Sequence, residues 1–539
     1  MRTRLFDAKA PVVVILLACV ALTLWSCNAK NGAEFKNGLG VGSCKFCDLR
    51  YDDFSRKDLT DADFSGAFLY GTNFSWSVAR NARFESAILS HARMEWADFD
   101  GGDFSKASMG DSALFRATFR NARMRMTTLS RANLVGSDLS HAEMLTAIMD
   151  GVDLTDALMT NTNLRNADLR SANLTNAKLR DADLHGAVLF NTHFLGADLK
   201  GTNFTGANLK KASFAGTYLK TTNFRKADLR DADFSDAILD AVNFQGAFLR
   251  RANFKGATIK NVVLQGADVC EAIMPDGRMG EPCSDKPLAS STVSLGIPPI
   301  LAQPAAGDKR VMVSVPGNLF AKTNRGIPVG VIAETMDAVL KKMGYLPVYV
   351  SMPISETHEA VAGGMVDIAA MAIPTAQGTE SFRFTLPVIE EYNTVLVRKQ
   401  GVFPLERVAD LHGHTLGGRE GYLYPLLTQD SKVTLQLFSS DGEMIRNLIL
   451  GKLDAVIISG ISNLYVLRSE GIMAQLDVLK KAVGLVPLRA AFSAKNFTQE
   501  QVEAFNVELG AFQRSPQWPA ILERNGLADL VREWDMVGP

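Results

Sequence analysis

The chain has 539 residues, a length that exceeds one ordinary hydrophobic core and favours two or three domains. Hydrophobic residues make up 47% of it and charged residues 21%, which is typical of globular proteins and excludes a disordered or fibrous chain. A formal net charge of −1 gives no overall attraction for nucleic acid, so we expect no nucleic-acid partner. Six cysteines are too few for a disulfide scaffold.

Residues 1–27 predict a secretory signal peptide, because basic residues precede an uncharged apolar run from Pro11 to Trp25. The run is shorter than the ~20 residues that a membrane-spanning helix needs. It ends at Cys27, with Leu24 three positions earlier, and this resembles the bacterial lipobox. The resemblance implies lipidation of Cys27 and a membrane-anchored periplasmic lipoprotein. Trp25 stands where a small residue is usual, and a soluble exported protein or an uncleaved anchor is the alternative.

A repeat with a period of five follows. From Leu49 to Val269 a large apolar residue recurs at about 45 successive fifth positions, interrupted only by Ala79, and small residues precede it by two places. This period fits neither an amphipathic helix nor an alternating strand. A square coil with four sides of five residues explains it, because every fifth side chain then points to the axis.

Residues twenty apart stack on one face of such a coil. The sequence predicts one ladder from Phe194, Phe214, Phe234 and Phe254, and another from Phe204, Phe224 and Phe244. This regular alternation resembles the pentapeptide-repeat family, which implies a right-handed quadrilateral β-helix over residues 48–274. At ~4.8 Å per coil, such a rod is about 50 Å long.

Cysteines stand at both ends of the repeat: Cys44 and Cys47 in the segment 28–47, and Cys270 and Cys283 around the last rung. Terminal coils of a solenoid expose apolar cross-section, so in an oxidising compartment we expect disulfide caps, Cys270 with Cys283 in particular. A redox-active C-x-x-C is the weaker alternative. A zinc site built from both pairs would require the ends of the rod to meet, so we expect no metal and no cofactor.

Residues 275–308 combine the cysteine-containing cap with a Pro- and Ala-rich stretch typical of a linker. Beyond it, β-branched runs such as 311–315 and 345–350 alternate with helical patterns such as 333–342. This alternation predicts a mostly parallel α/β sheet over residues 309–539.

The landmarks of this second half resemble the family 3 extracellular solute-binding proteins. They include a G-x-x-D motif at 364–367, D-L-x-G at 410–413 and G-x-x-D-A at 451–455. The resemblance implies two α/β lobes with a crossover near 388–396, and a cleft that closes on a small polar solute by hinge motion. It also implies an ABC-type permease as a partner.

The family's two charged anchors for an α-amino acid are missing. An Arg three residues after the Thr at position 375 usually pairs with the ligand carboxylate, and an Asp usually holds the ammonium group. Gly378 and Ser459 occupy those places here. We therefore expect either a ligand other than an ordinary amino acid, with Arg383 or Arg419 as a new carboxylate partner, or a degenerate pocket.

By resemblance, we expect the ligand contacts at the strand exits. The candidates are Phe320, Thr375, Arg419, Tyr422 and Ser459. Tyr424 is a further candidate at the mouth of the cleft. Phe320 is alternatively a core residue, Thr375 a strand cap and Arg419 a solvated surface residue.

Three functions compete. The favoured one is an exported, membrane-anchored solute-binding protein whose rod acts as a spacer or docking surface. The second is an envelope scaffold or sensor that uses both halves for protein interaction. An enzyme is the least favoured, because no His lies among the cleft motifs to act as acid or base. Mimicry of DNA by the rod is also disfavoured, since residues 48–273 carry 28 acidic and 27 basic side chains. Polar outward positions of the rod are expected to be solvated.

Overall fold

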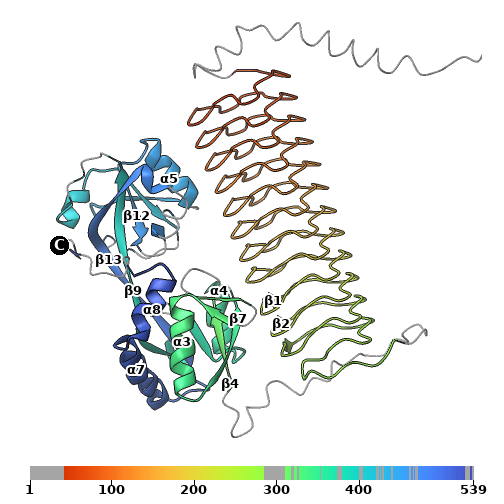
Figure 1. Cartoon of the computed structure of the whole chain (residues 1–539), viewed down its shortest axis with the longest axis vertical. Helices are drawn as coiled ribbons and strands as arrows, with labels where there is room; N and C mark the ends of the chain where they lie inside the picture. Colours follow the sequence, from red (N-terminus) through yellow and green to blue (C-terminus); the bar gives the residue numbers. More distant parts are fainter. Residues whose placement is uncertain are drawn as a thin grey trace, which may run out of the picture.

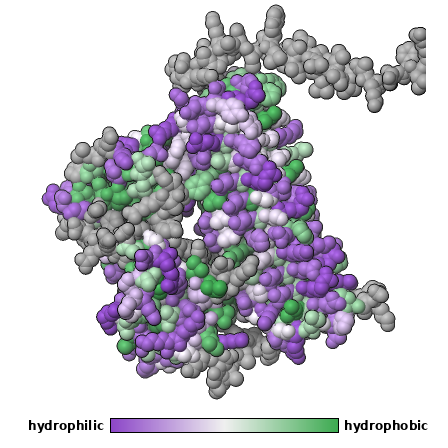
Figure 2. All heavy atoms as spheres, viewed as in Figure 1, coloured by the Kyte–Doolittle hydropathy of each residue, from purple (hydrophilic) through white to green (hydrophobic). Residues whose placement is uncertain are grey.

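The computed structural model consists of a long rod with a two-lobed α/β module beside it (Figure 1). It describes residues 42–283, 310–316, 321–324, 327–352, 354–372, 379–399, 403, 405–420, 424, 427, 430–438, 441–460, 463–464, 467, 472–528 and 535–536. The outer surface of the rod is largely hydrophilic in the view of Figure 2, as expected when apolar side chains point to the axis.

The rod is a quadrilateral β-helix with twenty residues per coil. Parallel bridges join residues twenty apart, from Ser43↔Asp63 to Asn253↔Ile273. Three strands extend this pairing: β1 (Tyr218–Lys220), β2 (Ile238–Asp240) and β3 (Thr258–Lys260). The predicted ladders are confirmed, with ring centroids 4.7 Å apart for Phe194 and Phe214 and 5.1 Å apart for Phe204 and Phe224.

Each corner of the coil is a tight turn with a residue in the left-handed region two places after the axial side chain. Asn166 has φ 55° and follows the axial Leu164, whose carbonyl accepts a hydrogen bond from the N–H of Ala167. Asn, Asp and Gly tolerate this conformation best, which explains their frequency there. Buried Thr side chains satisfy their hydroxyls by donating to a carbonyl of the preceding coil, as Thr202 does to Leu179 at 2.8 Å.

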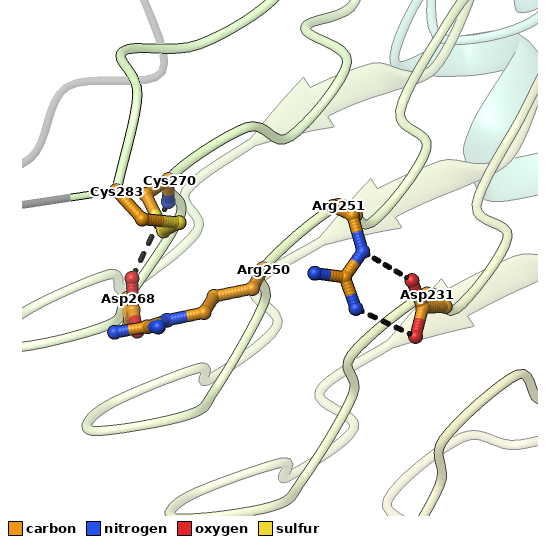
Figure 3. The surroundings of a disulfide bond; sticks show 6 residues. All are labelled: Asp231, Arg250, Arg251, Asp268, Cys270 and Cys283. Carbon is orange, nitrogen blue, oxygen red and sulfur yellow. Dashed lines mark hydrogen bonds and ion pairs between the residues drawn. A yellow bond between two sulfur atoms is a disulfide. The ribbon is translucent and has the colours of Figure 1, made fainter.

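Disulfides lie at both ends of the rod. Cys270 and Cys283 are bonded with their Cα atoms 5.0 Å apart, next to Asp268, which also pairs with Arg250 at 2.5 Å (Figure 3). Cys44 is bonded to Cys47 and is buried in line with the apolar ladder. The coil therefore begins a few residues before the expected boundary at 48.

The module holds one sheet of nine strands in the order β11-β10-β12-β9-β13-β8-β4-β7, with β14 on β13. The strands are β4 (Arg310–Val315), β7 (Leu346–Ser351), β8 (Ile368–Ala372), β9 (Phe382–Arg398), β10 (Leu416–Arg419), β11 (Leu435–Phe438), β12 (Ala455–Ser459), β13 (Leu476–Ser493) and β14 (Asp535–Met536). A separate hairpin joins β5 (Lys322–Asn324) to β6 (Ile327–Val329). The helices are α3 (Val331–Lys342), α4 (Ile354–Ala362), α5 (Asp441–Ile449), α7 (Gln499–Gln513) and α8 (Gln517–Arg524), with single 3₁₀ turns at Thr379–Ser381, Val408–Leu411 and Ile472–Ala474.

Two long antiparallel strands connect the lobes. Strand β9 pairs with β13 from Phe382↔Ser493 to Arg398↔Leu476, passing through the expected crossover near 388–396. Lobe 1 contains β4, β7 and β8 with α3, α4, α7 and α8, and lobe 2 contains β10, β11 and β12 with α5 (Figure 1). In each lobe the central strands are parallel, as predicted, so their carboxyl ends meet at one edge.

Candidate functional site

The carboxyl ends of the parallel strands form the candidate site, because loops beyond such ends bind ligands in open α/β sheets. Residues 317–320, 373–378 and 421–423, in the loops beyond β4, β8 and β10, lie outside the described part of the chain. Among the expected contacts, this applies to Phe320, Thr375 and Tyr422, and it also applies to Gly378 and to Cys27. Arg419 and Ser459 lie on the described strand ends.

Arg419 is the last residue of β10, and its side chain is largely held by neighbouring elements of lobe 2. Nη1 donates to the carbonyl of Phe438 at 3.1 Å, and Nε lies 3.6 Å from Oδ1 of Asp441. Tyr424 is buried, and its hydroxyl accepts a hydrogen bond from the backbone N–H of Arg419 at 2.7 Å. Burial raises the pKa of Tyr424 to about 12, so the phenol stays neutral and supports the Arg419 backbone rather than lining an open mouth.

Ser459 ends β12 and faces Asn393 of β9 in the sheet register, with its side chain buried. Arg383 instead lies near the start of β9, and its Nε donates to the carbonyl of Phe497 at 2.9 Å. Glu391, at the crossover, lies eight residues of extended strand beyond Arg383, a distance of about 26 Å. Of the two arginines considered as carboxylate partners, Arg419 is therefore at a strand exit and Arg383 is not.

The aspartates of the G-x-x-D and G-x-x-D-A motifs hold the strands in place. Oδ2 of Asp367 accepts the backbone N–H of Met312 in β4 at 2.8 Å. Oδ2 of Asp454 accepts both the backbone N–H and the hydroxyl of Thr415, just before β10, at 2.8 and 2.7 Å. These carboxylates are structural, one in each lobe.

The rod packs directly on lobe 1. The backbone N–H of Ser351, at the carboxyl end of β7, donates to the carbonyl of Gly216 in the rod at 2.7 Å. Tyr218 and Ile238 of β1 and β2 are buried in one apolar cluster with Val350 and Met352 of the module. Figure 1 shows β1 and β2 facing α4 and β7.

A buried carboxylate fixes this contact. Glu356 of α4 has a side chain only 3% exposed, and it accepts charge-assisted hydrogen bonds from Arg180 at 2.8 Å, Lys200 at 2.9 Å and Lys220 at 3.3 Å. Burial by itself would raise the pKa of Glu356, but the lysines more than offset it, and the pKa is lowered. Three successive coils of the rod thus converge on one side chain of lobe 1.

Lobe 2 packs on the rod several coils nearer the N-terminus. Trp76 and Trp96 stack with ring centroids 4.9 Å apart and are buried in the apolar core of the module, against side chains such as Met444 of α5. Glu443 of α5 pairs with Arg120 of the rod at 3.1 Å.

One ion pair at this contact is almost completely buried. Nη1 of Arg446 lies 3.0 Å from Oδ2 of Asp98, and the exposed fractions of the two side chains are 2% and 1%. Nε of Arg446 also donates to the carbonyl of Trp96 at 2.6 Å. Burial tends to raise the pKa of Asp98, but the charges of Arg446 and Arg80 outweigh burial. The pKa of Asp98 is therefore lowered, and the carboxylate is charged. Burial opposes the charge of Arg446, yet guanidinium remains protonated in proteins.

The expectation that outward positions of the rod are solvated is therefore wrong on this face, because lobes of the module cover it. The sequence contained only a partial signal for this. Trp76, Trp96, Tyr218 and Ile238 are large apolar residues at outward positions of the coil. Phe68, Ile88 and Phe248 also stand at outward positions and are exposed, so such residues do not by themselves identify the covered face. Arg446, Glu356 and their partners carried no comparable signal.

The described residues contain no group of three or more His, Cys, Asp or Glu side chains that could hold a metal ion. Within the same part of the chain, no helix has the length and apolar character needed to cross a membrane.

Comparisons with known proteins agree with the two halves of the fold. The family model for pentapeptide repeats matches five segments between residues 43 and 206, and a model described as pentapeptide repeat region matches 187–264. The model for bacterial extracellular solute-binding proteins, family 3, matches 312–527. The descriptions of these models name a repeat or a binding module, and none of them names a reaction. A search of curated proteins finds no match.

Solved structures resemble each half separately. HetL, a pentapeptide repeat protein of the cyanobacterium Nostoc, is 29% identical, with a TM-score of 0.23, covering 42% of this chain and 92% of its own. YCKB_BACSU from Bacillus subtilis is 16% identical, with a TM-score of 0.36, covering 43% and 96%. The amino acid ABC transporter substrate-binding protein AbpA from Streptococcus pneumoniae, bound to L-arginine, is 19% identical, with a TM-score of 0.32, covering 42% and 98%.

The chain therefore consists of a pentapeptide-repeat solenoid over residues 43–264 and a family 3 extracellular solute-binding domain over residues 312–527.

Proposed function

We propose that this protein is an exported, lipid-anchored solute-binding protein that captures a small polar solute between its two lobes, for delivery to an ABC-type permease. The observation that carries the proposal is the two-lobed family 3 module, in which β8 and β12 run in opposite directions and both end toward the crossover, at the levels of Pro387 and Asn393 of β9. Such strand ends are where open α/β sheets bind ligands. The lipobox-like sequence before Cys27 supports export and anchoring.

The rod acts in this proposal as a docking surface for the module itself. A spacer would leave both lobes free, whereas Gly216 contacts lobe 1 and Trp96 contacts lobe 2. Closure of the lobes by hinge motion would therefore change at least one contact with the rod.

Binding is tested by a thermal-stability screen of the intact protein against amino acids, small carboxylates, amines, opines and short peptides. A ligand at 100 times its dissociation constant adds about 2.7 kcal/mol to the free energy of unfolding. The proposal expects at least one saturable shift. No shift from any class, in a protein shown to be folded, would contradict it.

Anchoring has its own test. Expressed in a bacterial host, the protein is expected to incorporate a labelled fatty acid and fractionate with membranes, and the Cys27→Ala variant is expected to do neither. Equal labelling of the two proteins would contradict lipidation at Cys27.

The second candidate is an envelope scaffold or sensor. It is favoured by Gly378 and Ser459, which replace the family's two charged anchors. The same screen separates the two functions, because a scaffold needs no small ligand.

A further inference from the structure

The rod has one side that lies opposite to the module. The four corners of its first coil are left-handed turn residues, Phe46, Tyr51, Arg56 and Asp61, and the same corners recur every twenty residues. The cations that pair with the module stand between the third and fourth corners of later coils. They are Arg80, Arg120, Lys200 and Lys220. In a coil with four sides, the opposite side is the one between the first and second corners. We call it the outer face: residues 46–51 and those at multiples of twenty beyond them.

The exposed hydrophobic side chains of the rod are concentrated on the outer face. Within residues 42–283, eleven large hydrophobic side chains are exposed, and nine of them belong to this face. The nine are Phe46, Tyr51, Phe68, Tyr70, Ile88, Met126, Ile148, Phe190 and Phe248. A single exposed apolar side chain is ordinary, whereas a contiguous group of them marks an interaction surface.

The group is densest in the first three coils. Phe68 and Ile88 are bridged residues in successive coils, so their side chains are neighbours. The rings of Tyr51 and Tyr70 meet edge to face, with centroids 5.7 Å apart. Gly71 leaves room for this arrangement, because a Cβ there would lie 2.7 Å from the ring of Tyr51. Together these side chains form what we call the aromatic patch: Phe46, Tyr51, Phe68, Tyr70 and Ile88.

The aromatic patch is almost free of charge. Residues 66–71 and 86–91 contain no Lys, Arg, Asp or Glu, and the ring of His91 lies 5.1 Å from that of Tyr70. In the first coil Asp48 and Arg50 neutralise each other at 2.6 Å. Contact with an apolar medium would therefore bury no unpaired charge. Aromatic rings with and without a hydroxyl group are the side chains that suit the boundary between lipid and water.

The position of the aromatic patch favours a bilayer as its partner. Residues 28–41 connect Cys27 to the described rod, and such a segment spans at most about 50 Å when fully extended. The first three coils are thus within reach of a membrane that holds a lipid on Cys27, whereas the last coil lies about 50 Å further along the rod. The tether also raises the effective concentration of the patch at the surface, so a few side chains suffice for contact.

We propose that the aromatic patch rests on the bilayer that holds the lipid of Cys27, as a second contact between the rod and the membrane. The proposal rests on the lipid anchoring proposed above and adds a surface that orients the protein. Because the patch and the module occupy opposite sides of the coil, the two lobes would be held on the side of the rod turned away from the membrane.

The test uses the intact lipidated protein in vesicles of phosphatidylethanolamine and phosphatidylglycerol, with a diazirine on some acyl chains. Phe68 and Phe248 form a matched pair, since they stand in one column of the outer face and are 45% and 50% exposed. We expect photochemical cross-links to lipid at residues 46–91 and not at 246–251. We also expect hydroxyl radicals to oxidise Phe68 several-fold more slowly than Phe248.

Variants supply the control. The double variant Phe68→Ser, Ile88→Ser is expected to lose most of the cross-links at 46–91, and Phe248→Ser is expected to keep them. Thermal melting shows whether each variant is folded.

The outcomes separate this proposal from the anchoring on which it rests. A lipidated, vesicle-bound protein without cross-links at 46–91 would overturn the membrane contact and leave anchoring intact. Slow oxidation of Phe68 without cross-links to lipid would do the same, and would indicate a protein or a second copy of the chain on the patch. A protein that acquires no lipid at Cys27 would overturn both.

Discussion

Arg446 of α5 and Asp98 of the rod form a 3.0 Å ion pair in which both side chains are at least 98% buried. Its partners are 348 residues apart in the sequence, and it joins lobe 2 to the solenoid. Removing one member of a buried pair leaves the other charge without compensation, at a cost of about 3–5 kcal/mol. The pair therefore favours this position of lobe 2 on the rod over positions that leave either charge buried without a partner, even if its net contribution to stability is small.

We predict that Arg446→Ala detaches lobe 2 from the rod at denaturant concentrations that leave the coil folded. The stacked Trp76 and Trp96 report this, because their exposure shifts fluorescence emission to longer wavelength. The matched control is Arg170→Ala, which removes an exposed pair with Asp168 and is expected to change stability little. Identical emission profiles for the two variants would count against the buried pair.

Glu356 and Glu359 of α4 provide a second comparison. Both accept a hydrogen bond from Lys220, but Glu356 is buried and also accepts bonds from Arg180 and Lys200, whereas Glu359 is 66% exposed. We expect Glu356→Gln to increase hydrogen exchange at α4 and in the facing coils, and Glu359→Gln to change it little. Equal exchange in the two variants would show that the charge cluster does not hold lobe 1.

Docking is expected to be lost in acid. The pKa values of Asp98 and Glu356 are lowered in the folded chain by facing cations that outweigh burial. The stability from each is complete above its unfolded pKa of about 4 and is lost as pH falls through its lower folded pKa. Asp100 opposes this slightly, since burial and Asp98 raise its pKa. Tryptophan emission followed from pH 7 to about 2.5 should show release below pH about 4. Constant emission over this range would contradict the prediction.

Loss of the disulfide between Cys270 and Cys283 is expected to loosen the last coils. The bond spans 13 residues, for which chain entropy predicts about 3 kcal/mol. The bond between Cys44 and Cys47 spans 3 residues and is expected to contribute less. Hydrogen exchange at residues 250–283 in the Cys270→Ser, Cys283→Ser double variant measures the effect. Unchanged protection there would argue against a capping role.

The solenoid could be predicted closely because its information is local and repeated. A five-residue period places Phe204 and Phe224 in successive coils, and their rings stack at 5.1 Å as the period requires. Turn positions follow from the same period. The order of the α/β elements could be inferred as well, since strand and helix patterns alternate along residues 310–524.

The docking of the two halves could not be predicted in the same way. Asp98, Arg180 and Lys200 have the residue types of ordinary solvated repeat positions, and nothing near them in the sequence identifies Arg446 or Glu356 as partners. The indication of a covered face came from the outward apolar residues Trp76, Trp96, Tyr218 and Ile238. Of the expected ligand contacts, Arg419 and Ser459 fall on described strand ends, and the others lie outside the described residues.

The claim that rod and module form one solute-binding unit is tested most directly by calorimetric titration of the intact protein and of Arg446→Ala. The titrant is the compound that gives the largest stabilisation in the screen. We predict saturable binding with one solute per chain, weakened about tenfold in Arg446→Ala, whose contact between lobe 2 and the rod is destabilised. Equal affinity in the two proteins would show that the module binds without the solenoid, and absence of saturable binding to the intact protein would contradict the account as a whole.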